Sequence, residues 1–143
     1  MSLTVHTEQI IDAPPGAVWE VLTDLEHYPT WNPFIIEAQG TAEVGRKLRI
    51  TIRLGESTFG FRPTVTEANP PHTLEWLGRL FIPGIFDGRH RFELHSAEHG
   101  ATRLVHSERF SGFAVRLIPG LEQKTLAGFE AMNRAIASTV CAQ

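Results

Sequence analysis

Alternation of apolar and polar residues is the clearest pattern in the middle of the chain, and it predicts β-strands. In KLRITIRL at 47–54, Leu48, Ile50, Ile52 and Leu54 alternate with basic residues and a threonine, so one face of this strand is buried and the other is wet. Turn-forming stretches such as EVGR, NPP and EHG separate most of the segments and favour an antiparallel meander. Strands are predicted at 3–12, 34–42, 47–54, 58–67, 72–80, 88–97 and 101–110.

A second pattern, apolar residues three or four positions apart, predicts a short helix near the start of the chain. It begins at Pro15, a residue that suits the first turn, and Val18, Val21 and Leu22 give it one apolar face. Asp24 is expected to cap a further turn, which Pro29 closes.

The same spacing predicts a final helix of about twenty residues, or ~30 Å, after Pro119 and Gly120. Its apolar stripe must lie against the concave face of the sheet, which is the large apolar surface available to it. The fold class is therefore α+β, with a curved antiparallel sheet of about seven strands wrapped around a long C-terminal helix and two short helices after the first strand. The stripe is formed by Leu126, Phe129, Asn133, Ile136 and Val140, with Met132 beside it.

Three segments carry a resemblance to a known superfamily: IIDAPPGAVWEVLTDLEHYPTWNPF at 10–34, HRFEL at 90–94 and TRLVHSERFSG at 102–112. With the order of predicted elements, they resemble the START-like, or SRPBCC, superfamily of polyketide cyclase/dehydrase-related and Bet v 1-like helix-grip proteins. The resemblance extends over the whole chain and implies a single domain at 1–143. Members bind lipids, sterols, aromatic polyketides or hormones, and others cyclise polyketides. The sequence contains no pattern that selects one subgroup.

Composition and charge narrow the classes of partner. The chain has 143 residues, of which 42% are hydrophobic and 20% charged, as expected for one globular core. Thirteen Lys and Arg residues are scattered among sixteen Asp and Glu residues, which disfavours nucleic acid as a partner. No secretion signal or transmembrane segment is apparent, and the single cysteine, Cys141, is near the end, so we expect a cytoplasmic protein.

The polar residues of the sixth and seventh predicted strands give the sharpest chemical hypothesis. A hairpin turning through EHG pairs Leu94 with Leu104, Phe92 with His106, and His90 with Glu108 on the inner face. An imidazole beside a carboxylate can act as a general acid and base in enolisation or dehydration. The alternative is that the two groups satisfy each other or orient a ligand.

A cavity for a small hydrophobic ligand is expected between the sheet and the final helix. Asn133 either faces this cavity or lies at the solvated edge of the helical stripe. The apolar walls are predicted to be Trp31, Phe59, Phe61, Trp76, Phe92, Phe110, Phe129 and Met132. The polar contacts are predicted to be His90, His106, Glu108 and Asn133.

Two predicted loops, at 80–86 and 112–120, are more apolar than is usual for surface loops. In an antiparallel meander both lie near the start of the final helix. They form a lid or rim over the pocket, or a patch that meets a membrane or a second subunit of a homodimer, or a plain extension of the core. Their apolar residues are Phe81, Ile82, Ile85, Phe86, Phe113, Val115, Leu117 and Ile118.

The sequence suggests no metal site and no cofactor. Motifs such as HExxH or paired cysteines are absent, and His90 and His95 fall on opposite faces of one strand. Arginines 53, 62, 89, 91 and 103 are assigned to the solvated outer face. For Arg62 a position in the pocket is the alternative, and it would indicate an acidic ligand.

The leading hypothesis is a binding module for a small hydrophobic or aromatic metabolite. The alternatives are an enzyme of the cyclase, aromatase or dehydratase type using His90 and Glu108, and an interaction module acting through the apolar loops.

Overall fold

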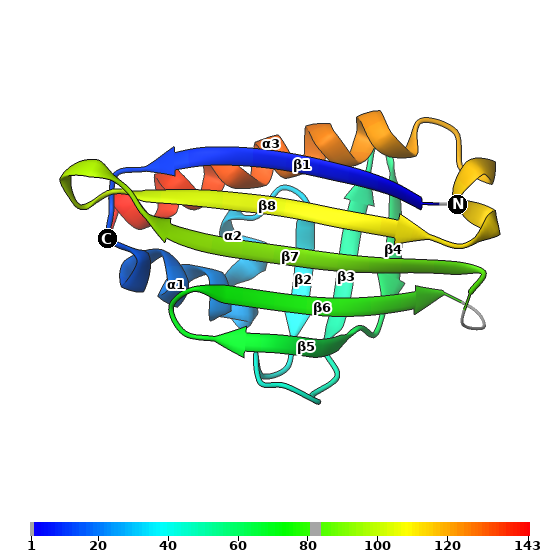
Figure 1. The fold of residues 1–143 in the computed structure, drawn as a ribbon, viewed down its shortest axis with the longest axis horizontal. Coiled ribbons are helices and arrows are strands. Elements are labelled where there is room, and N and C mark those ends of the chain that lie inside the picture. Colours follow the sequence, from blue (N-terminus) through cyan, green and yellow to red (C-terminus); the bar gives the residue numbers. More distant parts are fainter. Residues whose placement is uncertain (1, 81–83) are drawn as a thin grey trace.

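The main sheet of the computed structural model, which describes residues 2–80 and 84–143, has five antiparallel strands in the order β1-β8-β7-β6-β5. Neighbouring strands in this sheet follow the meander predicted from the sequence, except that the first strand pairs with the last (Figure 1). The strands are β1 (Ser2–Ile11), β5 (Thr64–Asn69), β6 (Thr73–Leu80), β7 (Phe86–Ser96) and β8 (Thr102–Ser111).

A second sheet contains β2 (Ile35–Gln39), β3 (Arg49–Leu54) and β4 (Ser57–Phe61) and crosses behind the first at a steep angle (Figure 1). The single strand predicted at 58–67 was wrong, because it is divided between β4 and β5, which belong to different sheets. Pro63 lies at the break and has no N–H for a strand ladder, although its carbonyl accepts a bond from Leu48 N at 2.8 Å.

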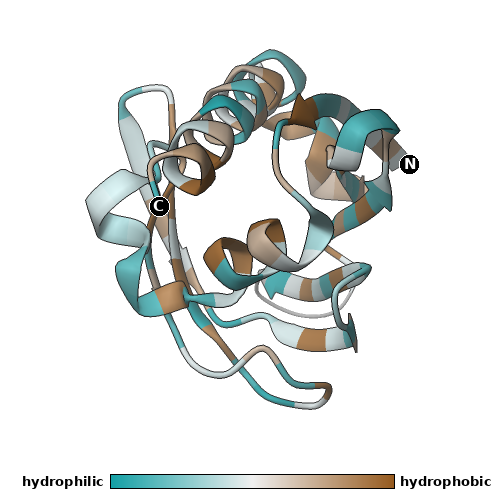
Figure 2. Cartoon of the chain, turned by 90° about the vertical axis from the view of Figure 1, so that its left-hand side faces the viewer, coloured by the Kyte–Doolittle hydropathy of each residue, from teal (hydrophilic) through white to brown (hydrophobic). Residues whose placement is uncertain are grey.

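Three short helical segments close one end of the curved sheet: α1 (Pro15–Thr23), a 3₁₀ turn (Leu25–His27) and α2 (Tyr28–Trp31). Figure 2 looks along the molecule from that end and shows α1 in the opening between the sheets and the long helix. The predicted cap at Asp24 was wrong. Its side chain makes no capping hydrogen bond and instead contacts His27 Nδ1 at 2.7 Å.

The long helix α3 (Leu121–Cys141) covers the concave face, as predicted (Figures 1 and 2). Its buried stripe starts at Leu121 and Thr125, whereas Leu126, which the sequence analysis placed in the stripe, is 38% exposed. Residues four positions apart lie on the same side of a helix, so the stripe through Phe129 continues to Thr125 and Leu121. Leu126 was placed in the stripe because it is apolar, and the predicted buried side was therefore wrong for the first turns.

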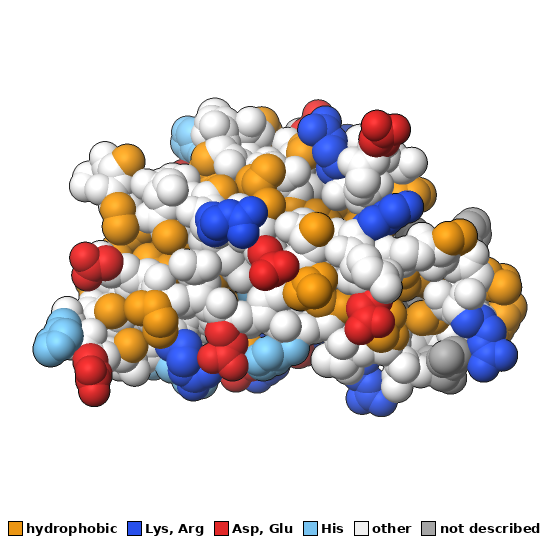
Figure 3. Space-filling view, turned by 90° about the horizontal axis from the view of Figure 1, so that it is seen from above, with side chains coloured by type: hydrophobic (Ala, Val, Ile, Leu, Met, Phe, Trp, Pro, Cys, Tyr) orange, Lys and Arg blue, Asp and Glu red, His pale blue; other side chains and the backbone are white. Residues whose placement is uncertain are grey.

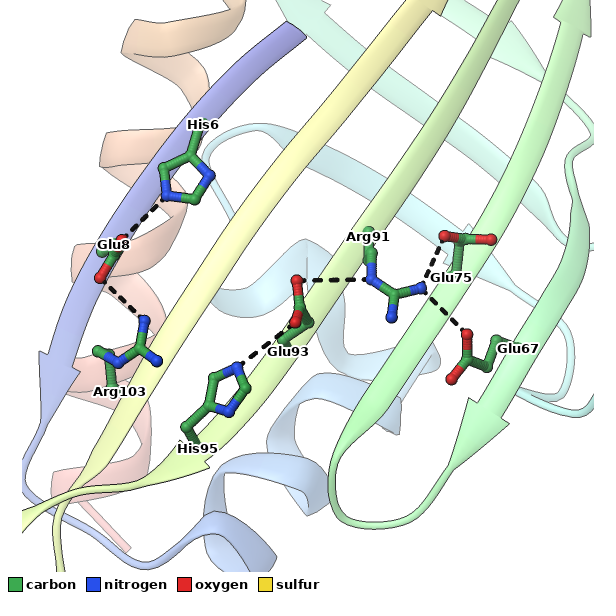
Figure 4. A network of polar contacts seen from close by, with 8 residues as sticks. All are labelled: His6, Glu8, Glu67, Glu75, Arg91, Glu93, His95 and Arg103. Atoms are coloured by element: carbon green, nitrogen blue, oxygen red, sulfur yellow. Dashed lines mark hydrogen bonds and ion pairs between the residues drawn. The ribbon is translucent and has the colours of Figure 1, made fainter.

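The outer face of the main sheet carries the charges (Figure 4). Arg91 Nη1 contacts Glu67 Oε1 at 3.0 Å and Glu75 Oε2 at 2.9 Å, and Arg89 Nη1 contacts Glu75 Oε1 at 2.7 Å. Burial acts to raise the pKa of Glu75, but hydrogen bonds from Arg89, Thr66 and Arg91 outweigh it and lower that pKa below its ordinary value. The predicted division into a wet outer face and an apolar inner face is confirmed.

One close contact between α3 and the segment before β2 can be tested by substitution. A Cβ on Gly128 would overlap the ring of Phe34, so Gly128→Ala is expected to destabilise the protein by about 1–3 kcal/mol through overpacking. Elsewhere in a helix this change stabilises by about 0.5–1 kcal/mol. Gly16→Ala in α1 is the matched control, because a Cβ there meets nothing within 4 Å. Urea denaturation measures both, and a Gly128→Ala variant as stable as the control would contradict the contact.

Candidate functional site

An apolar cavity of about 90 Å³ lies beneath the start of β7, the end of β8 and the first turns of α3. Phe59 on β4, one of its walls, is 44% exposed, so the cavity reaches the surface beside that strand. By the usual measure ~10–15 Å³ is room for one water molecule, so this space admits a small organic group. Its apolar walls are Phe34, Ile52, Leu54, Phe59, Phe61, Phe86, Phe110, Ile118 and Leu121.

Two glycines on neighbouring strands help to keep this space open. Gly78 of β6 pairs with Gly88 of β7, and both border the cavity. A Cβ on Gly78 would lie 2.9 Å from the ring of Phe61, and one on Gly88 would overlap Glu108 Oε2. Neither glycine was among the site residues predicted from the sequence, although a glycine inside a strand often marks close approach by another group.

The predicted pairing of β7 with β8 is confirmed at Leu94–Leu104, Phe92–His106 and His90–Glu108. His90 Nδ1 lies 3.4 Å from Glu108 Oε1, and their side chains are 3% and 12% exposed. Both residues border the cavity. The imidazole and the carboxylate therefore meet at its wall.

Behind His90, four hydrogen bonds lead to the backbone of β8. Thr7 Oγ1 bonds to the carbonyl oxygen of His106 at 2.8 Å, and Asn133 Nδ2 bonds to Thr7 Oγ1 at 2.9 Å. Asn133 Oδ1 lies 2.7 Å from His106 Nδ1, and His106 Nε2 lies 2.7 Å from His90 Nε2. All four side chains are buried.

The direction of each bond in this chain follows from its last acceptor. A carbonyl oxygen only accepts, so Thr7 donates its single proton there and must itself accept from the Asn133 amide. The other end of that amide, Oδ1, then accepts from His106 Nδ1–H. In a neutral His106, Nε2 has no proton and accepts from His90 Nε2–H.

The pKa of His106 supports this neutral state. Burial lowers it well below the ordinary value, the nearby His90 lowers it further, and the hydrogen bond to Asn133 opposes this only in part. With Nε2–H of His90 committed to His106, the ring atom of His90 that faces Glu108 Oε1 is Nδ1. The wall of the cavity thus holds an imidazole nitrogen 3.4 Å from a carboxylate oxygen.

The structure separates the predicted site residues into two groups. Phe59, Phe61, His90, Glu108 and Phe110 border the cavity. The others fill space instead: His106 stacks on Phe129 with ring centroids 3.8 Å apart, and Trp31 packs on Tyr28 at 5.0 Å. This second group consists of Trp31, Trp76, Phe92, His106, Phe129, Met132 and Asn133, none of which borders the cavity.

Both predicted positions for Asn133 were wrong. It is 1% exposed and faces the sheet, where it links His106 to Thr7, so it lies neither at the cavity nor at a solvated edge. Arg62 is exposed and lies outside the cavity.

Thr125, a further residue missed from the sequence, brings a polar group to the cavity. It is 1% exposed, and its Oγ1 has no hydrogen-bond partner among the residues that the structure describes. Thr125 was missed because the predicted stripe passed through Leu126 instead. The wall residues Phe34, Ile52, Leu54 and Leu121 were also not predicted as site residues.

The predicted apolar loops differ in their outcome. Phe86 and Ile118 border the cavity, Val115 is buried, and Ile85 is partly buried. Phe113 and Leu117, on a 3₁₀ turn (Phe113–Leu117), are 65% and 69% exposed. This turn lies at the right-hand end of the molecule, where Figure 3 shows apolar atoms at the surface. Phe81 and Ile82 lie outside the described residues. Contact with a membrane or a second subunit stays a prediction.

Two searches of the described part of the chain concern metals and membranes. Within 2–80 and 84–143, no three His, Cys, Asp or Glu side chains are grouped so as to hold a metal ion. No helix in these ranges is long and apolar enough to cross a membrane.

Comparison with known proteins gives one family and many similar folds. The family model described as polyketide cyclase/dehydrase and lipid transport matches residues 2–139. No curated protein matches the sequence. Among solved structures, a START superfamily protein from Mycobacterium smegmatis has a TM-score of 0.76 at 21% identity, covering 97% of each chain.

Two similar structures are of enzymes. The Zhui aromatase/cyclase from Streptomyces sp. R1128 has a TM-score of 0.76 at 16% identity, covering 98% of this chain and 94% of its own. A norcoclaurine synthase from Thalictrum flavum, solved with a transition-state analogue, has a TM-score of 0.73 at 15% identity, covering 99% and 96%. At these identities the likeness concerns the fold alone.

The lowered pKa of His106 predicts a pH-dependent stability. The unfolded chain takes up a proton at this histidine near the ordinary pKa of about 6.5, whereas the folded protein does so only at lower pH. The stabilisation is therefore present above pH ~6.5 and is lost as the pH falls below it, by up to ~1.4 kcal/mol per pH unit. Urea denaturation at several pH values should show a shallower slope for His106→Gln than for the wild type.

Imidazole ¹⁵N NMR provides a second measurement of the same group. His106 is expected to remain a neutral Nδ1–H tautomer at pH 6, where an ordinary histidine is mostly protonated. Equal slopes for the two proteins, or an imidazolium spectrum for His106 at pH 6, would refute the assigned hydrogen-bond directions.

Proposed function

The chain belongs to the polyketide cyclase/dehydrase and lipid-transport family of START-like proteins, and from this premise we propose that it binds a small hydrophobic or aromatic molecule in the cavity between its sheets and α3. A ligand-binding fold is common to the family. The finer proposal concerns the chemistry of the ligand and the residues that would touch it.

The observation that carries the proposal is the contrast within the cavity wall. Among the described residues, nine apolar side chains surround a space that reaches solvent, while only His90, Glu108 and Thr125 offer polar side-chain atoms. Several of the apolar walls, including Ile52, Leu54 and Phe61, remain partly exposed in the protein alone. An apolar ligand would remove this surface from water, which favours binding by ~25 cal/mol for each Å² covered.

Native mass spectrometry of freshly purified protein, followed by solvent extraction, tests whether a molecule is bound. We expect an apolar small molecule, or, if the protein is isolated empty, a rise in melting temperature with members of a lipid and aromatic library. An empty protein that no member of such a library stabilises would argue against a binding function.

A cavity-filling variant checks that binding occurs at this place. In Gly78→Ala the added Cβ would displace the ring of Phe61 toward the cavity, so affinity for the captured ligand is expected to fall by about tenfold or more. Gly60→Ala on β4 is the control, because its Cβ makes only ordinary contacts, at 3.9 Å. Calorimetric titration measures both, and equal affinities would place the ligand elsewhere.

A second candidate function is acid–base catalysis on a carbonyl compound, of the cyclase, aromatase or dehydratase type. It is favoured by the 3.4 Å contact between His90 Nδ1 and Glu108 Oε1 at the cavity wall. Such a pair can remove a proton from carbon beside a carbonyl and return it to oxygen, and general acid–base groups contribute about 10²–10⁴-fold to a rate.

Hydrogen–deuterium exchange at the carbon beside the carbonyl, followed by NMR in D₂O, separates this candidate from simple binding. If the pair is catalytic, the protein accelerates exchange of a bound ketone, and Glu108→Gln lowers the rate at least about 100-fold with the ketone still bound. If the pair only orients the ligand, the wild type gives no acceleration and Glu108→Gln weakens binding alone. We expect the second result.

A further inference from the structure

We propose that the polar end of the cavity is a site for a neutral hydroxyl group, so that the preferred ligand is an alcohol or phenol with an apolar body. This inference rests on the proposed binding function and specifies the ligand class. It combines a hydroxyl on Thr125 that has no partner among the described residues with Glu108 Oε2, the carboxylate oxygen that lies over Gly88.

Thr125 differs from other helical threonines of the same protein. Thr23 donates to the carbonyl of Trp19 at 2.8 Å, and Thr139 donates to the carbonyl of Ala135 at 2.7 Å, which is the usual four-residue arrangement. Thr125 Oγ1 makes no such bond within the described chain, although it is buried and borders the cavity. An unmet buried hydroxyl lowers stability, so its position here favours a partner that the ligand brings.

Glu108 offers the complementary acceptor. Its Oε1 faces His90 Nδ1, while Oε2 occupies the space above Gly88 that a side chain would otherwise fill. Because Oε1 is the oxygen that contacts His90, Oε2 has lone pairs available to a donor. A hydroxyl group can donate its proton to Oε2 and accept the proton of Thr125.

Charge and hydrogen-bonding capacity at the wall favour a hydroxyl group over a carboxylate or an ammonium group. No Lys or Arg occurs among the described residues that border the cavity, so a carboxylate ligand would lie beside Glu108 without a cation. An ammonium group has no lone pair to accept the proton of Thr125. A hydroxyl group satisfies both residues and adds no net charge.

The test uses three probes with one apolar body: 4-ethylphenol, ethylbenzene and 4-ethylbenzoate. At pH 7 the phenol is neutral and the benzoate is charged. Calorimetric titration of the wild type is expected to show the phenol binding at least about tenfold more tightly than either of the others, since a hydrogen-bonding site discriminates against a ligand that leaves its buried groups unpaired.

Two substitutions at position 125 assign this preference. Thr125→Val keeps the shape and removes the hydroxyl, so the preference for phenol over ethylbenzene is expected to fall several-fold. Thr125→Ser retains a hydroxyl and is expected to retain the preference. The unliganded Thr125→Val protein should also melt at a higher temperature than the wild type, because its unmet hydroxyl is gone.

The outcomes distinguish this inference from the binding function beneath it. Equal affinity of the wild type for phenol and ethylbenzene, or an equal change for both probes in Thr125→Val, overturns the hydroxyl site and leaves the cavity as a binding site. Tighter binding of 4-ethylbenzoate also overturns it. If none of the three probes binds, the proposed binding function fails for ligands of one ring, and the inference fails with it.

Discussion

The carbonyl oxygen of His106 can only accept a hydrogen bond, and this constraint orders the hydrogen bonds by which Asn133 of α3 joins the main sheet. Thr7, Asn133 and His106 each have a single arrangement of donors and acceptors that satisfies it. Buried polar groups without partners are costly, so this chain of bonds favours one rotation and one axial position of α3 on the sheet. It also determines which atom of His90 faces the cavity.

The inner space of the protein is divided between a packed half and a hollow half. On each of two neighbouring strands, inward-facing positions two residues apart lie on opposite sides of this boundary. On β6 the inward-facing position 76 is tryptophan and position 78 is glycine. On β7 position 90 is histidine and position 88 is glycine. The large rings stack beneath α3 and contribute most to stability, while the glycines leave room that a ligand can occupy.

Polar groups are distributed between the faces of the main sheet according to charge. The outer face carries arginines and glutamates that pair with one another, and its buried carboxylate, Glu75, is bonded to both Arg89 and Arg91. At the inner face, the described residues that border the cavity include one carboxylate and one imidazole but no Lys or Arg, so an anionic ligand would have no cation beside it. The cavity is thus suited to neutral ligands, and the chemistry at its wall depends on the ligand group that reaches Glu108.

The sequence by itself determined the helix-grip fold, the long C-terminal helix and the pairing of His90 with Glu108, because strand period and a short turn fix register locally. It did not determine which apolar residues fill space and which border it. Phe92 and Phe110 have the same side chain on adjacent strands, yet only Phe110 borders the cavity. That difference depends on where α3 and the second sheet lie over the strand. Likewise the roles of Asn133, Thr125 and Gly88 follow from contacts between elements far apart in the chain, which periodicity does not encode.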